Sequence, residues 1–116
     1  MEYDLNPRAS STSLAVNIPT IKYCLWKAGK YAKPPYPLKL RVTHRRKPKY
    51  YGRNYGLDMK LTASELEAIL GNPRGQNRKK REFLDSFKSH FERIINEMSL
   101  QFGPNEFTFG ELESRL

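Results

Sequence analysis

Hydrophobic and polar positions alternate through the first part of the segment 37–56. Leu38, Leu40 and Val42 occupy every second position. The positions between them carry polar side chains, namely Lys39, Arg41 and Thr43. A period of two is typical of a strand with one face in the core. The pattern predicts a strand with an apolar face and a cationic face, where an ordinary exposed face would mix charges of both signs.

A turn and another strand are expected to follow. Proline cannot donate a backbone hydrogen bond, so the Arg-Arg-Lys-Pro sequence at residues 45–48 predicts a turn. Lys49, Tyr50 and Tyr51 then have the aromatic composition of a strand, and Gly56 ends the sheet. The tyrosines are expected to pack in the core or at an edge, with stacking on a ligand as the alternative. The segment therefore predicts a hairpin with an apolar back and a basic front.

An earlier strand is predicted over residues 20–27. Ile21, Tyr23 and Leu25 alternate with a second set, which is Lys22, Cys24 and Trp26. If the cations share one side of the sheet, the first set faces the core. Trp26 then stands on the basic face or packs as core at the sheet edge, and the pattern leaves both open. Residues 28–36 form a loop because two consecutive prolines cannot continue a central strand, and Lys30 and Lys33 on this loop could reach a phosphate.

Two helices are predicted after the sheet. Thr62 and Glu65 have the spacing of a capping box, and Gly71 to Pro73 stop the short helix that follows. A long helix is predicted over residues 78–99, because apolar side chains recur there at spacings of three and four: Leu84, Phe87, Phe91, Ile94, Ile95 and Met98. This stripe would cover the apolar sheet face. The expected fold is α+β, a three-stranded antiparallel sheet packed on one face by a long C-terminal helix.

The ends of the chain are expected to lie outside this unit. Residues 1–19 are predicted to be a flexible arm, with a short leading strand at the alternating Leu14, Val16 and Ile18. Gly103 and Pro104 mark a break, and Thr108 with Glu111 predicts a second capping box. A helix that begins there is expected to have nothing to pack against. The predicted organisation is an arm over 1–19, a domain over 20–102, and a linker with the start of another domain over 103–116.

The charge of the chain is unevenly distributed. The 116 residues carry a formal net charge of +9. Residues 20–56 contain eleven cationic side chains and no acidic one. Residues 57–116 contain nine cationic and ten acidic side chains. The whole excess lies in the predicted sheet and its loops, which favours a polyanionic partner.

Other kinds of chemistry have weak support in the sequence. Cys24 is the only cysteine, which reads as a small buried hydrophobe, and with His44 and His90 it makes no recognisable zinc site. We therefore expect no cofactor and no catalytic activity. No apolar run approaches the roughly 18 residues of a membrane span, and the N-terminus lacks signal-peptide order, so a cytoplasmic protein is expected.

The candidate ligand-binding residues follow from the basic face. A β-ribbon can enter the DNA major groove, where arginine and lysine read guanine and a threonine methyl touches thymine. The predicted DNA-binding residues are Lys22, Trp26, Lys30, Lys33, Lys39, Arg41, Thr43, Arg45, Arg46, Lys47, Lys49 and Arg53. The cations of residues 78–81 are a second cluster, which either contacts phosphate or forms a solvated turn balanced by Glu82 and Asp85.

The order of several short motifs resembles a known family. They are Tyr36 to Thr43, Arg46 to Tyr50, Gly56, and Leu61-Thr62 with Glu65, followed by Phe107-Thr108-Phe109 with Leu112. Residues 20–116 resemble the arm-type DNA-binding domain of phage and mobile-element integrases, the tyrosine recombinases, followed by the first helix of their core-binding domain. The resemblance implies a three-stranded sheet laid into double-stranded DNA at arm sites, a catalytic domain beyond Leu116, a place at the bacterial nucleoid, and other integrase protomers or accessory DNA-bending proteins as partners.

Two other functions stay open at this level. A three-stranded sheet with a covering helix also binds double-stranded RNA, where loops and a helix end make the contacts. The apolar stripe from Phe87 to Met98 could instead serve a protein-interaction domain.

Overall fold

The computed structural model describes residues 18–103 and 106–116. In chain order the strands and helices are β1 (Thr20–Leu25), η1 (Gly29–Tyr31), β2 (Tyr36–His44), β3 (Lys47–Tyr51), η2 (Arg53–Tyr55), β4 (Lys60–Leu61), α2 (Ala63–Leu70), α3 (Gln76–Phe102) and α4 (Phe109–Arg115), where η marks a short 3₁₀ turn. Residues 1–17 of the predicted arm, which include Leu14 and Val16 of the predicted leading strand, fall outside the described residues.

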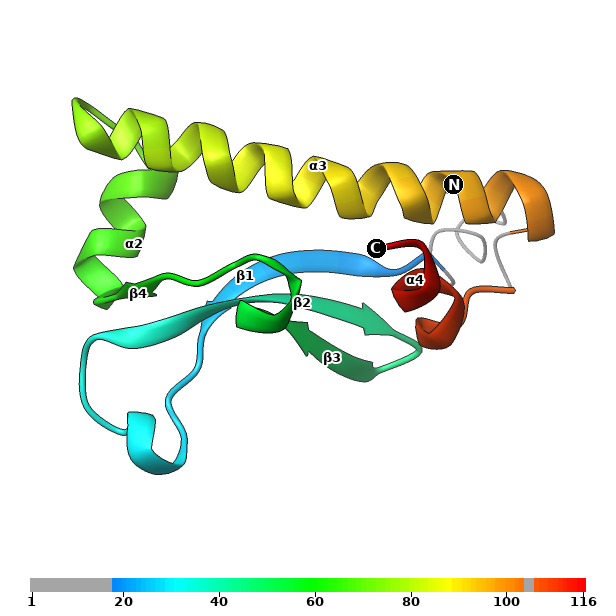
Figure 1. The fold of residues 1–116 in the computed structure, drawn as a ribbon, viewed down its shortest axis with the longest axis horizontal. Helices are drawn as coiled ribbons and strands as arrows, with labels where there is room; N and C mark the ends of the chain where they lie inside the picture. The colour runs from blue at the N-terminus through cyan, green and yellow to red at the C-terminus, as the bar shows by residue number, and fades with distance from the viewer. Residues whose placement is uncertain (1–17, 104–105) are drawn as a thin grey trace, which may run out of the picture.

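The predicted α+β fold is confirmed. The antiparallel sheet has the order β1-β2-β3, and the two-residue β4 pairs with the start of β2. Helix α3 runs along one side of this sheet (Figure 1), so sheet and helix form two layers. The core between them contains the apolar face of β2 and the stripe of α3, including Leu38, Leu40 and Val42 opposite Leu84 and Phe91.

The hairpin turn is shorter than the predicted one. Arg45 and Arg46 alone connect β2 to β3, and both have positive φ angles, of 53° and 67°. A two-residue turn with this backbone matches the right-handed twist of the flanking strands. Lys47 and Pro48 therefore belong to β3. Pro48 is tolerated there because β3 borders only β2 among the described strands, and a proline can occupy an edge strand.

The helix boundaries follow the local signals. Thr62 accepts a hydrogen bond from the Glu65 amide while the Glu65 carboxylate accepts one from the Thr62 amide, which is the predicted capping box. Helix α3 is longer than predicted by two residues at its start and three at its end. Its flanking glycines, Gly75 and Gly103, have φ angles of 59° and 89°, a region that glycine adopts without strain.

The expectation that the last helix has nothing to pack against is wrong. Phe107 and Leu112 are 8% and 0% exposed and belong to the same core as Leu40. The Tyr51 hydroxyl donates a hydrogen bond to Glu113 Oε2 at 2.9 Å. Figure 1 shows α4 beside the sheet, on the side that faces α3. Residues 106–116 thus contribute to the core of the sheet domain.

Candidate nucleic-acid interface

The strand register separates the cations of the sheet into two faces. Lys22 pairs with Arg41 across β1 and β2, and Arg41 pairs with Tyr50 across β2 and β3. Because alternate residues point to opposite sides of a sheet, these side chains lie opposite Leu40 and Val42, which are buried against α3. We call this side the outer face; it comprises Thr20, Lys22, Cys24 and Trp26 from β1 and its extension, Lys39, Arg41 and Thr43 from β2, and Pro48, Tyr50 and Gly52 from β3 and its extension.

Arg41 stands at the centre of the outer face. It lies between Lys22 and Tyr50 in the register and is half-buried. Its Nε is shielded from solvent and has no hydrogen-bond acceptor among the described residues. A shielded guanidinium nitrogen without an acceptor is unfavourable in an isolated domain. Such an arrangement is typical of a site whose acceptor is supplied by an anionic ligand.

Cys24 occupies the same face beside these cations. Burial raises the pKa of its thiol, and the nearby Arg41 and Lys39 oppose that shift without reversing it. The thiol is therefore neutral at physiological pH and not an activated nucleophile. Its half-buried position agrees with the predicted role as a small apolar side chain.

The side chain of Lys39 lies against the backbone of Gly52, in space that a larger residue at position 52 would occupy. A Cβ built on Gly52 would lie 2.9 Å from Lys39 Cδ and 3.1 Å from its Nζ. The Nζ itself lies 5.8 Å from the ring centroid of Trp26. Lys39 thus has an ordered stem and an ammonium over an aromatic ring.

Two aromatic rings complete the outer face. Trp26 and Tyr50 meet at 5.0 Å between centroids, with their planes at 69°. This places Trp26 on the basic face, where it is half-buried, and settles the alternative that the sequence left open. Tyr50 and Gly52 were not among the predicted site residues. Once the structure pairs Pro48 with Thr43, steps of two along β3 and its extension place both on this face.

The remaining cations of this region frame the face. Arg45 and Arg46 form the exposed hairpin turn, and Lys30 and Lys33 are exposed on the β1–β2 loop. Arg53 in η2 is exposed and lines a groove together with Lys39 and Lys60. The loop that carries η1 extends away from the two layers, beyond the sheet (Figure 1).

Lys47 and Lys49 do not share the outer face with the other predicted residues. They pair in the register with His44 and Val42, whose strand positions face the core side. Lys49 forms an ion pair with Glu113 on α4. This pairing and the hydrogen bond from Tyr51 lower the pKa of the Glu113 carboxyl, while burial opposes them. In the free domain Lys49 therefore fastens α4 to the sheet.

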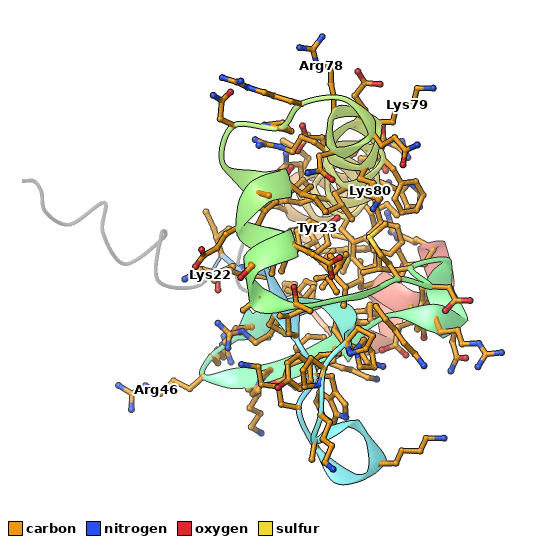
Figure 2. The ribbon with its side chains drawn as sticks, turned by 90° about the vertical axis from the view of Figure 1, so that its left-hand side faces the viewer. Lys22, Tyr23, Arg46, Arg78, Lys79 and Lys80 are labelled. Carbon is orange, nitrogen blue, oxygen red and sulfur yellow. The ribbon has the colours of Figure 1, made fainter. Side chains whose placement is uncertain are left out.

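The cluster at residues 78–81 is divided between two roles. Arg81 donates from Nε to both Asp85 carboxylate oxygens, at 3.0 and 3.2 Å, and from Nη1 to the carbonyl of Leu70 at 2.7 Å. It thereby closes the C-terminal end of α2, where cations are favourable. Arg78 and Lys79 stay exposed at the end of the molecule away from the sheet hairpin that carries Arg46 (Figure 2). They do not extend the outer face.

Metal clusters and membrane-spanning helices are absent from the described part of the chain. Residues 18–103 and 106–116 contain no group of three or more metal-ligating side chains. None of the helices described has the length and apolarity needed to cross a membrane. Comparisons with protein-family models, curated proteins and solved structures find no match to this chain.

Proposed function

We propose that this domain binds double-stranded DNA through the outer face of its sheet, without catalytic activity of its own. The observation that carries the proposal is the gathering of Lys22, Lys39 and Arg41 on one sheet face, in a segment of eleven cationic side chains and no acidic one. A cationic face of this kind attracts a polyanion at long range and neutralises its phosphates on contact.

The shape of the face favours a duplex groove. A β-ribbon fits the B-DNA major groove, which is roughly 12 Å wide. Arg41 lies mid-strand and can present its guanidinium to a guanine edge, while Thr43 beside it can contact a thymine methyl. Lys33 and Arg46, which are exposed on the loop and the hairpin turn, would contact phosphate. Helix α3 packs on the opposite side of the sheet (Figure 1) and would remain outside the groove.

The biological setting of this binding is inferred from the sequence motifs alone. Their resemblance to arm-type domains supports a DNA-binding module of a tyrosine recombinase that acts at the bacterial nucleoid. Within such an assembly, other integrase protomers and DNA-bending proteins would be its neighbours. The tyrosine nucleophile would lie on another domain, and neither Tyr50 nor Tyr51 has that role.

The two alternative functions have less support. A-form RNA has a deep, narrow major groove that side chains cannot read, so a basic sheet face is better suited to DNA. The protein-interaction alternative required an available apolar stripe. Phe91, Ile94, Ile95 and Met98 are instead all 5% exposed or less and lie within the core.

A competition experiment tests the proposal. The full chain is bound to a labelled DNA duplex and challenged with DNA and RNA duplexes of matched length and sequence at several salt concentrations. If roughly six cations meet phosphates, the slope of log K against log salt should be about −5. We expect DNA to compete better than RNA. Equal or better competition by RNA, or a nearly flat salt dependence, would overturn DNA binding through this face.

A further inference from the structure

The aromatic pair on the outer face is not explained by phosphate binding. Trp26 is half-buried and Tyr50 is 36% exposed. Both rings lie on the same face as Lys22, Lys39 and Arg41. Neither ring belongs to the core that holds α3 against the sheet. The Tyr50 hydroxyl and the Trp26 indole N–H can donate hydrogen bonds to phosphate, but the ring carbons gain more from an apolar group on the ligand that covers this face.

The major groove offers one apolar group on its base edges. This group is the C5-methyl of thymine, while the other groups that distinguish the base pairs there are hydrogen-bond donors and acceptors. We propose that Trp26 and Tyr50 together form a pocket edge that contacts a thymine methyl, so that the domain prefers a thymine beside the base read by Arg41. This inference rests on the proposed function, because it requires the outer face to enter a DNA groove.

The arrangement of neighbouring side chains supports a fixed reading position. Tyr50 pairs directly with Arg41 in the register. The Lys39 stem lies against Gly52, and its Nζ lies over the Trp26 ring. The aromatic pair is therefore placed next to the mid-strand guanidinium by three strands of regular sheet. Contacts on rigid elements are more selective than contacts on loops.

The same geometry argues against stacking of single-stranded bases. Stacking platforms present aromatic faces to successive bases. Here the two rings are inclined at 69° and meet edge to face, and the Lys39 ammonium already lies over the Trp26 ring. Two parallel faces are not offered. A methyl group, which needs only a ring edge and a shallow contact, fits this pair better than two stacked bases do.

The test compares thymine with deoxyuridine, which differs only by the methyl group. A preferred duplex is first selected from a random pool with the full chain, and each thymine is then replaced singly by deoxyuridine. At one or two positions this replacement should weaken binding by the parent protein about fourfold, the effect of exposing one buried methyl. Trp26→Ala and Tyr50→Leu should each bind the two duplexes with equal affinity. Phe83→Leu, which removes an exposed ring on α3, should keep the fourfold difference.

Each outcome separates the inference from the proposed function. If the parent binds duplex DNA with a steep salt dependence but no replacement has an effect, the methyl contact is wrong and DNA binding stands. The same holds if Trp26→Ala and Tyr50→Leu both retain the methyl effect. If single-stranded DNA binds more tightly than the duplex and Trp26→Ala abolishes that preference, the rings are a stacking platform. If no duplex binds, the proposed function and this inference both fall.

Discussion

The packing of α3 on the sheet can be tested by removing one ring from its centre. Phe91 is 1% exposed, and its ring lies 5.2 Å from that of Tyr51 on β3 and 5.1 Å from that of Phe87. Phe91→Ala removes these contacts and leaves a cavity between the two layers. Substitutions of this kind cost about 3–5 kcal/mol, whereas a domain of this size has a total of about 5–15 kcal/mol.

Phe83→Ala provides a matched control on the same helix. Phe83 is 45% exposed and approaches Phe87 at 6.2 Å between centroids. Both changes give the helix the same residue, so the propensity gain is shared and the difference between them reports burial. We expect Phe83→Ala to cost at most about 1.5 kcal/mol, since it loses part of one aromatic contact.

The assay is urea denaturation of the full chain, followed by circular dichroism. With a slope of about 1–3 kcal/mol per molar urea, Phe91→Ala should lower the unfolding midpoint by at least about 0.5 M relative to Phe83→Ala. A Phe91→Ala protein that unfolds at the midpoint of the parent would refute the two-layer packing. The apolar stripe of α3 would then be available to a partner, and this result would support the protein-interaction function.

The remaining predictions concern the outer face and the docking of α4. Arg41→Ala should cost about 1–3 kcal/mol of binding free energy on a selected duplex and relax the preference at one base position. Lys33→Ala should weaken binding to all duplexes alike and reduce the slope of log K against log salt by about one. If binding isotherms show equal losses for Arg41→Ala on selected and scrambled duplexes, Arg41 is another phosphate contact. Glu113→Gln should destabilise the domain at neutral pH, because Lys49 and Tyr51 hold the folded pKa of this carboxyl below its ordinary value. Because the folded pKa is lowered, the ionised carboxylate stabilises the fold at pH values above the unfolded pKa, and this stabilisation is lost as the pH falls through the folded pKa. Thermal melts of the parent and the variant should therefore converge in acid, below the ordinary glutamate pKa. A constant difference between them at all pH values would contradict this role.

The alternation in the sequence carried most of the information about the sheet. Leu38, Leu40 and Val42 are buried as predicted, because a period of two in a half-buried strand fixes which side chains share a face. The faces of Lys47 and Lys49 were not assigned in this way. The turn was predicted to include four residues and contains two, so the position of β3 relative to β2 could not be assigned from its composition.

The role of the last residues could not be read from local signals. Thr108 caps α4 as predicted, since its Oγ1 accepts a hydrogen bond from the Glu111 amide at 3.2 Å. The partner that holds this helix, Tyr51, is 62 residues earlier in the chain. A contact between such distant residues depends on the assembled core, and neither hydrophobic period nor capping spacing records it. The same limitation applies to the stem of Lys39 against Gly52, which depends on strand register.

The central claim is that the outer face, and no other cationic surface, binds the duplex. Figure 2 places Lys22 and Arg46 apart from Arg78 and Lys79, which lie at the α3 end of the molecule, and all four are exposed. The double variants Lys22→Glu/Arg46→Glu and Arg78→Glu/Lys79→Glu change the net charge equally. Equilibrium binding to one DNA duplex should fall by about 100-fold or more for the first pair and by less than about fivefold for the second. Equal losses, or a larger loss for the second pair, would contradict the assignment of the interface to the sheet.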